Sequence, residues 1–150
     1  MKIFLLYVVT FVCIVLFDIV WFSVSSGFYK KEIGFLFGPS LNYIPALLFY
    51  LLYAVGIIFF VVFPLLKGAS GGSGAAGLDV GVASAGAFAR YSKAFLTGAL
   101  FGLIAYGTYD LTNHTTINNW PVLVTVVDML WGGLATGVVS VIVLAVGGVI

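Results

Sequence analysis

The sequence has few charged residues and almost no excess of either sign. Only 7% of its 150 residues are Asp, Glu, Lys or Arg, whereas soluble domains contain about 25%. The formal net charge of +1 gives no indication of the basic face or stripe that nucleic acid binding needs. We therefore expect no nucleic acid partner.

Side chains that bind metals or act as nucleophiles are also scarce. A single cysteine, Cys13, excludes an intramolecular disulfide and any cysteine cluster for zinc or iron–sulfur. His114 is the only histidine, so a metal or haem site lacks further ligands, and no histidine-activated nucleophile is indicated. Two aspartates can in principle act as acid and base, but nothing indicates a substrate. We expect no metal, no cofactor and no enzymatic activity.

Hydrophobic residues, by contrast, make up 63% of the chain, against about 45–50% in soluble domains. A soluble fold of this size still exposes roughly a third of its unfolded-chain surface, so this composition indicates an integral membrane protein. Four apolar runs reach the length of about 20 residues that crosses a bilayer as a helix. The sequence therefore predicts one all-α domain, a four-helix transmembrane bundle. The predicted spans are residues 3–24, 44–66, 94–111 and 121–146.

The segments between these runs predict the topology. Residues 68–87 are rich in Gly, Ala and Ser and predict a flexible loop, while residues 25–43 place charges beside aromatic rings, as in a headgroup-level segment. Basic residues favour the cytoplasmic side, which predicts both termini on the cytoplasmic or matrix side of a bacterial or mitochondrial inner membrane. The termini share their side with Lys2, Lys67, Arg90 and Lys93, and the other side carries Lys30 and Lys31.

Two similar motifs place a carboxyl within the predicted spans, Asp18-x-x-Trp21 and Asp128-x-x-Trp131. Carboxyls at membrane depth are costly and are candidate functional groups. On alternating spans, Asp18 lies about 9 Å and Asp128 about 10 Å from the same membrane face. Asp110, near the end of the third span, joins the same half of the bundle, so we expect a polar cluster in one leaflet.

Neighbouring polar and aromatic residues extend this cluster. No Lys, Arg or His lies at that depth, and Tyr106, Asp110 and Asn113 follow an i, i+4, i+7 spacing along one helical face. Helical side chains lean toward the N-terminus, so we expect each tryptophan to lie over the aspartate of its own motif. The predicted cluster consists of Asp18, Trp21, Tyr106, Tyr109, Asp110, Asn113, Asp128 and Trp131.

Such carboxyls are open to two interpretations. In one, each aspartate is a protonated or hydrogen-bonded strut between helices, a contact that contributes about 0.6–2 kcal/mol. In the other, the cluster handles protons, cations or a small polar solute, with a shared proton or a bound cation neutralising the charge. The residue pattern leaves both open.

Small residues four apart indicate close helix packing. Gly98 and Gly102 lie in the third predicted span, and Gly133 and Gly137 in the fourth. Such grooves let another helix approach closely, but they do not say whether that helix belongs to the same chain. Four short helices leave much lateral surface, so we also expect self-association or contact with other membrane subunits.

The chain resembles a known family in the strings "AFLTGALFGLIAYGTYDLTN" and "NNWPVLVTVVDMLWGG", of which "TYDLTN" and "VDMLWG" are the most specific. They are similar to the small integral membrane family catalogued as domain of unknown function 2177. The resemblance implies a four-helix membrane protein without an assigned activity and omits the Gly/Ala/Ser-rich residues 68–89. Its recurring positions correspond here to Asp18, Trp21, Tyr109, Asp110, Asn113, Trp120, Pro121, Asp128, Trp131 and Gly132.

Two functions are compatible with these features. One is an accessory or structural subunit of a membrane assembly. The alternative is a small transporter or binding protein that handles protons, cations or a small polar solute through Asp18, Asp110 and Asp128.

Overall fold

A computed structural model describes residues 1–40, 42–70 and 80–149, and the regular structure within them is helical. Four segments of these residues are long and apolar enough to cross a membrane, as the sequence predicts: Lys2–Leu36, Tyr43–Lys67, Gly86–Thr116 and Val122–Val149. The elements in chain order are α1 (Lys2–Ile33), η1 (Gly34–Leu36), α2 (Tyr43–Gly56), η2 (Ile57–Val62), α3 (Phe63–Ser70), α4 (Val80–Thr116) and α5 (Val122–Val149).

Helix α1 continues well past the predicted end of the first span at residue 24. Its 32 residues correspond to about 48 Å of helix, more than the hydrocarbon core of about 30 Å. The helix continues because its buried residues recur every four or seven positions, which keeps one stripe against the bundle as far as Ile33. These buried residues are Leu6, Thr10, Ile14, Asp18, Ser25, Tyr29 and Ile33.

The second span is helical throughout but changes its winding in the middle. Asn42 caps its start, since the side-chain oxygen accepts a hydrogen bond from the Ile44 amide at 3.2 Å. Residues Ile57–Val62 form a π-helix, in which the Phe63 amide bonds to the Ile58 carbonyl five residues back. Pro64 has no amide hydrogen to donate, and the wider turns before it keep the backbone paired within the membrane.

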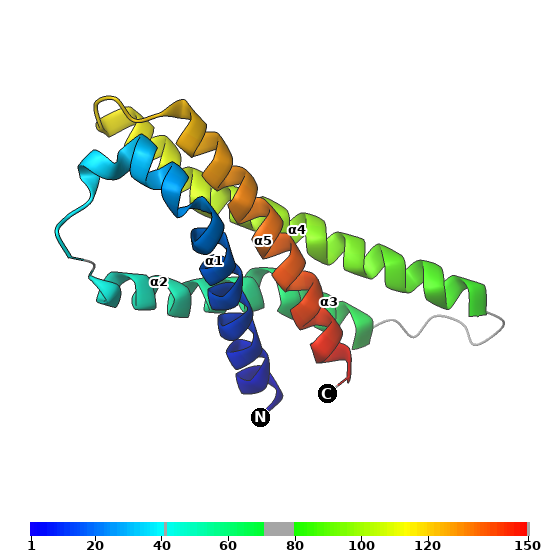
Figure 1. The fold of residues 1–150 in the computed structure, drawn as a ribbon. Helices are drawn as coiled ribbons and strands as arrows, with labels where there is room; N and C mark the ends of the chain where they lie inside the picture. Colours follow the sequence, from blue (N-terminus) through cyan, green and yellow to red (C-terminus); the bar gives the residue numbers. More distant parts are fainter. Residues whose placement is uncertain (41, 71–79, 150) are drawn as a thin grey trace.

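Helices α4 and α5 run antiparallel and form the closest interface (Figure 1). A Cβ added at Gly102 would meet the Gly132 carbonyl oxygen, and one at Gly137 would lie 3.0 Å from the Phe95 carbonyl oxygen. A Cβ at Gly98 would meet the Ser140 side chain. The glycine grooves of the two helices therefore face each other, so the partner of each groove lies in the same chain.

Helix α4 extends beyond the predicted third span at both ends. It begins at Val80, so residues 80–87 are helical where the sequence predicts a flexible loop; residues 71–79 of that loop lie outside the described part of the chain. At the other end the helix reaches Thr116, and the threonine hydroxyls of this polar segment are satisfied within the helix by bonds to carbonyls four residues back. These threonines are Thr108, Thr112, Thr115 and Thr116.

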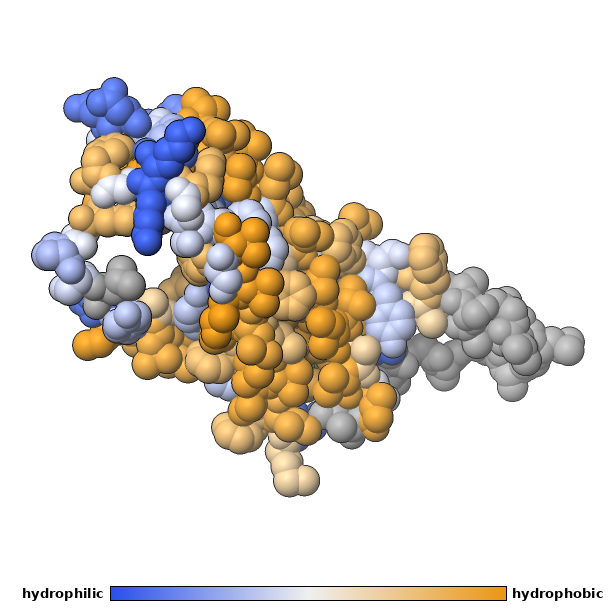
Figure 2. All heavy atoms as spheres, viewed as in Figure 1, coloured by the Kyte–Doolittle hydropathy of each residue, from blue (hydrophilic) through white to orange (hydrophobic). Residues whose placement is uncertain are grey.

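The surface reflects a membrane setting. Hydrophobic side chains cover most of the face seen in Figure 2, and hydrophilic ones gather where α1 ends and α4 turns into α5. Both chain termini lie together at the opposite end of the molecule (Figure 1). The spans are thus bordered by two distinct ends, one with the termini and one with the α4–α5 turn.

We expect Gly102→Ala to lower the free energy of unfolding by about 1–3 kcal/mol, because the new methyl group meets backbone atoms of α5. Gly27→Ala on α1 is the matched control: nothing lies within 4 Å of its added Cβ, and alanine favours a helix by about 0.5–1 kcal/mol. Unfolding of the purified variants in one detergent measures both. Equal stability of the two variants would contradict the close α4–α5 contact.

Candidate functional site

The two Asp-x-x-Trp motifs meet between α1 and α5. The Trp131 indole nitrogen donates a hydrogen bond of 3.0 Å to the Asp18 carboxyl. The Trp21 indole donates at 3.1 Å to the Tyr29 hydroxyl, which in turn donates to the Asp128 carboxyl. Each motif therefore helps to hold the carboxyl of the other.

This exchange corrects the expectation that each tryptophan covers its own aspartate. The indole N–H lies at the outer edge of a large ring, so it reaches the facing helix rather than back along its own. Trp131 thus crosses to Asp18, while Trp21 connects to Asp128 through Tyr29. The hydrogen bonds join the antiparallel helices α1 and α5.

Stacking of the two indoles supports the exchange. The Trp21 and Trp131 rings lie 4.4 Å apart between centroids with an interplanar angle of 8°. Stacked aromatic pairs contribute about 0.5–1.5 kcal/mol beyond the area that they bury. Because the stacked rings restrain each other, the stacking also helps to orient the two indole N–H groups toward their hydrogen-bond acceptors.

Tyr29 is the site residue that sequence reasoning missed. It lies in the segment assigned to the headgroup region, yet it is buried and on the same helix as Trp21. Its spacing of eight from Trp21, with buried Ser25 between them, is the repeat of one helical face. From this spacing the sequence could have predicted that Tyr29 lies in the site, beyond the end of the apolar run.

The two aspartates lie at different distances from the ends of their helices. Because α1 ends at Ile33 rather than near residue 24, Asp18 lies about 22 Å of helix rise from that end. Asp128 lies about 9 Å from the start of α5 at Val122. Since α1 is longer than the hydrocarbon core is thick, its end does not mark the membrane face, and the matched depth of the two aspartates stays a prediction.

Tyrosines from the second and third spans surround the Asp18 end. The Tyr50 hydroxyl approaches the Asp18 carboxyl. Tyr53 lies 2.7 Å from the Thr136 hydroxyl, and because Thr136 donates to the Gly132 carbonyl at 2.6 Å, Tyr53 is the donor. Tyr106 packs against Gly132, where any Cβ would meet its ring. Hydrogen bonds and ring packing thus link α2, α4 and α5 next to the network.

Asp110 differs from the other two aspartates. Its exposed fraction is 0%, and neither carboxyl oxygen has a hydrogen-bond partner. It interacts electrostatically with Asp128 and with Tyr29. An ionised carboxyl without partners is far more costly to bury than a neutral one. The Asp110 carboxyl therefore lacks a hydrogen-bond donor, whereas the Asp128 carboxyl with which it interacts accepts a hydrogen bond from Tyr29.

Two of the predicted residues lie outside the network. Tyr109 is 58% exposed, and its ring meets Trp120 edge-on at 6.0 Å. Asn113 approaches the Tyr109 hydroxyl near the end of α4. Tyr109 precedes Asp110 by one residue, a rotation of about 100° around the helix, so its side chain points away from the network and packs against Trp120 near the α4–α5 turn.

The aspartates do not form a cluster of metal ligands. Among the residues that the structure describes, no three His, Cys, Asp or Glu side chains come close enough together to hold a metal ion. Asp18 and Asp128 instead accept hydrogen bonds from an indole and a phenol.

We expect Trp131→Phe to reduce the free energy of unfolding by about 1–3 kcal/mol, because it leaves the buried Asp18 carboxyl without its indole donor. Trp120→Phe is the matched control, since its indole donates at 3.0 Å to a neutral Thr125 hydroxyl. Thermal unfolding in one detergent compares them. If Trp131→Phe lowers the free energy of unfolding no more than Trp120→Phe does, the hydrogen bond to Asp18 contributes no more to stability than the one to Thr125.

Comparison with known proteins finds a family for this chain. The model of a family of predicted membrane proteins, DUF2177, matches residues 3–90 and 80–145. No curated protein and no solved structure matches. The family match covers nearly the whole chain, including all three aspartates of the site. The chain therefore belongs to the DUF2177 family of predicted membrane proteins, the family that its aspartate and tryptophan motifs resemble.

Proposed function

We propose that this protein binds and releases protons within the membrane, with Asp110 as the group that carries the proton. The observation behind the proposal is the fully buried Asp110 carboxyl, both of whose oxygens lack a hydrogen-bond partner. A proton needs only one carboxyl, whereas a metal ion needs several ligands. The proposed role is not enzymatic.

Asp128 and Tyr29 are the partners for proton exchange. In the proposed resting state, Asp110 is neutral and carries the proton, while Asp128 accepts the Tyr29 hydrogen bond. Two neighbouring carboxyls at low dielectric favour a single net charge between them. When the proton leaves the Asp110 oxygen and binds the Asp128 carboxylate, the single negative charge of the pair moves from Asp128 to Asp110. Trp21 continues to donate to the Tyr29 oxygen throughout.

Protons reach Asp110 from the end of the bundle opposite the chain termini. Asp110 is about 9 Å of helix rise from the end of α4 at Thr116, and that end also holds the α4–α5 turn. With both termini on the cytoplasmic or matrix side, this entry faces the other compartment.

The accessory-subunit role stays a prediction. The exposed large hydrophobic side chains of the described helices are compatible with a partner subunit, but lipid covers such surfaces equally well. The proton-binding proposal is favoured because it explains the unpartnered Asp110 carboxyl, whereas the accessory-subunit role does not require it.

The proton count of the purified protein tests this function. A pH jump is applied to the full chain in weakly buffered detergent, and a pH-sensitive dye records the protons exchanged. We expect Asp110→Asn to exchange one proton fewer than the parent chain. Glu32→Gln, the same chemical change at a carboxyl paired with Lys31 at 3.8 Å outside the network, is the matched control. An unchanged count for Asp110→Asn across neutral pH would contradict the proposal.

A further inference from the structure

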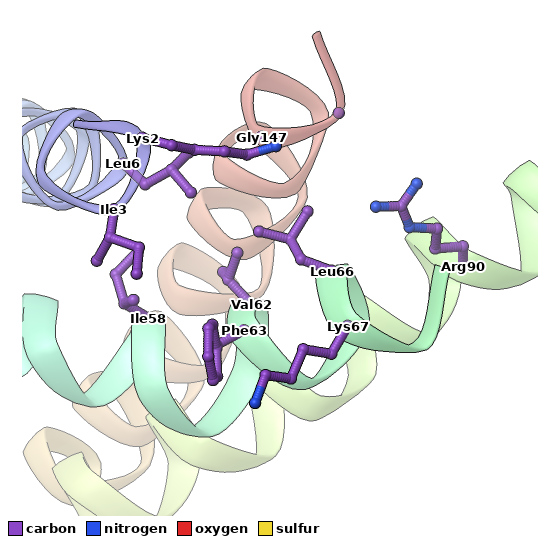
Figure 3. A pocket seen from close by; sticks show the side chains of 11 residues that line it. Lys2, Ile3, Leu6, Ile58, Val62, Phe63, Leu66, Lys67, Arg90 and Gly147 are labelled. Atoms are coloured by element: carbon purple, nitrogen blue, oxygen red, sulfur yellow. The ribbon is translucent and has the colours of Figure 1, made fainter. Parts of the chain in front are cut away.

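A second site lies at the other end of the bundle, beside the chain termini. A groove of about 580 Å³ opens there between α1, η2, α3, α4 and the C-terminal end of α5. This volume is in the range of small-molecule sites, about 300–1,000 Å³. Figure 3 shows its lining side chains coming from separate helices. None of the aspartates of the proton site contributes to it.

Three basic side chains line this groove, each from a different helix. Lys2 comes from α1, Lys67 from α3 and Arg90 from α4 (Figure 3). The Arg90 Nε is buried and has no hydrogen-bond partner. The ammonium of Lys67 lies 4.5 Å from the centre of the Phe63 ring, which holds it beside the groove. Among the described residues the one ion pair is Lys31–Glu32, at the other end of α1.

The remaining wall is apolar. Leu6, Ile58, Val62 and Leu66 line the same groove as the basic side chains. Positive charge beside a hydrocarbon-like wall complements a molecule that joins an anionic head to an acyl chain. Basic pockets between transmembrane helices bind anionic lipid head groups for this reason.

We propose that this groove binds the phosphate of an anionic phospholipid, with one acyl chain against the apolar wall. Arg90 supplies a planar, multi-donor contact to the phosphate, and Lys67 adds a second charge. Lys2 also lies beside the C-terminal turn of α5, at Gly147 and Gly148, and offsets the partial negative charge of that helix end. The lipid joins the ends of all four spans, so its binding stabilises the bundle.

Lipid retention by the full chain tests the proposal. The protein is placed in nanodiscs of phosphatidylcholine with a minor fraction of phosphatidylglycerol, and native mass spectrometry identifies the lipids that stay bound. We expect retention of phosphatidylglycerol over phosphatidylcholine. Each basic residue near anionic lipid contributes a several-fold preference, so the pair Lys67→Gln and Arg90→Gln should weaken retention about tenfold or more.

Controls separate this site from general charge attraction. The pair Lys30→Gln and Lys31→Gln removes the same charge from the other end of the molecule and should leave retention unchanged. The pair Lys67→Arg and Arg90→Lys keeps the charge, so it should retain more lipid than the first Gln pair, though less than the parent chain because lysine lacks the planar donors of Arg90; this guards against a folding defect in the first pair. No preference for phosphatidylglycerol, or equal losses in both Gln pairs, would overturn the proposal. Inorganic phosphate that stabilises the protein as well as the lipid does would reassign the groove to a free anion.

Discussion

Replacing Asp110 by leucine is expected to raise the free energy of unfolding by about 1–3 kcal/mol, because an unpartnered buried carboxyl is exchanged for an apolar side chain of similar size. Asp128→Leu should act in the opposite direction by a similar amount, since it removes the acceptor of the Tyr29 hydroxyl. Both variants lose one carboxyl of the same network. Thermal unfolding of both in the same detergent measures the difference.

The sign of the stability change in Asp110→Leu distinguishes a functional carboxyl from a structural one. A residue whose removal stabilises the fold is not retained as a strut between helices. If Asp110→Leu destabilises the protein as much as Asp128→Leu does, then Asp110 has a structural partner and the proton-binding interpretation loses its main support.

Removing the hydroxyl of Tyr29 should have the second large effect. Tyr29→Phe takes away the donor to Asp128 and the acceptor of Trp21 in one step. Hydrogen bonds to charged groups contribute about 1.5–3 kcal/mol and neutral ones about 0.5–1.5 kcal/mol, so a loss of about 2–4 kcal/mol is expected.

A double-mutant cycle assigns that loss to its partner. Tyr29→Phe and Asp128→Leu, measured singly and together, should show a coupling energy of about 1.5–3 kcal/mol. Tyr109→Phe is the matched control, because Tyr109 is exposed beside Trp120. Additive effects of Tyr29→Phe and Asp128→Leu would show that these side chains do not form the bond described.

The spans and the interface glycines follow from local features of the sequence. Apolar length alone defines a spanning helix because the bilayer requires every backbone group to be paired internally. Small residues four apart at Gly98 and Gly102 indicate a groove on α4. Which helix packs into that groove depends on the three-dimensional arrangement of the spans. The residue spacing within α4 therefore could not predict that α5 is the partner.

The hydrogen-bond partners in the site depend on helix rotation. Whether Trp131 bonds to Asp128 or to Asp18 is decided by how α1 and α5 are rotated and shifted against each other. That geometry is the sum of many contacts along both helices. Tyr29, in contrast, was within reach of sequence reasoning, because its helical spacing from Trp21 continues past the apolar run.

Infrared difference spectroscopy tests the central claim most directly. The C=O stretch of a neutral carboxyl is separate from the bands of a carboxylate, so a pH step across neutrality reports which carboxyls gain or lose a proton. We predict a neutral-carboxyl band that is present in the parent chain and in Glu32→Gln and missing in Asp110→Asn. A spectrum of Asp110→Asn identical to that of the parent chain would show that Asp110 does not carry the proton.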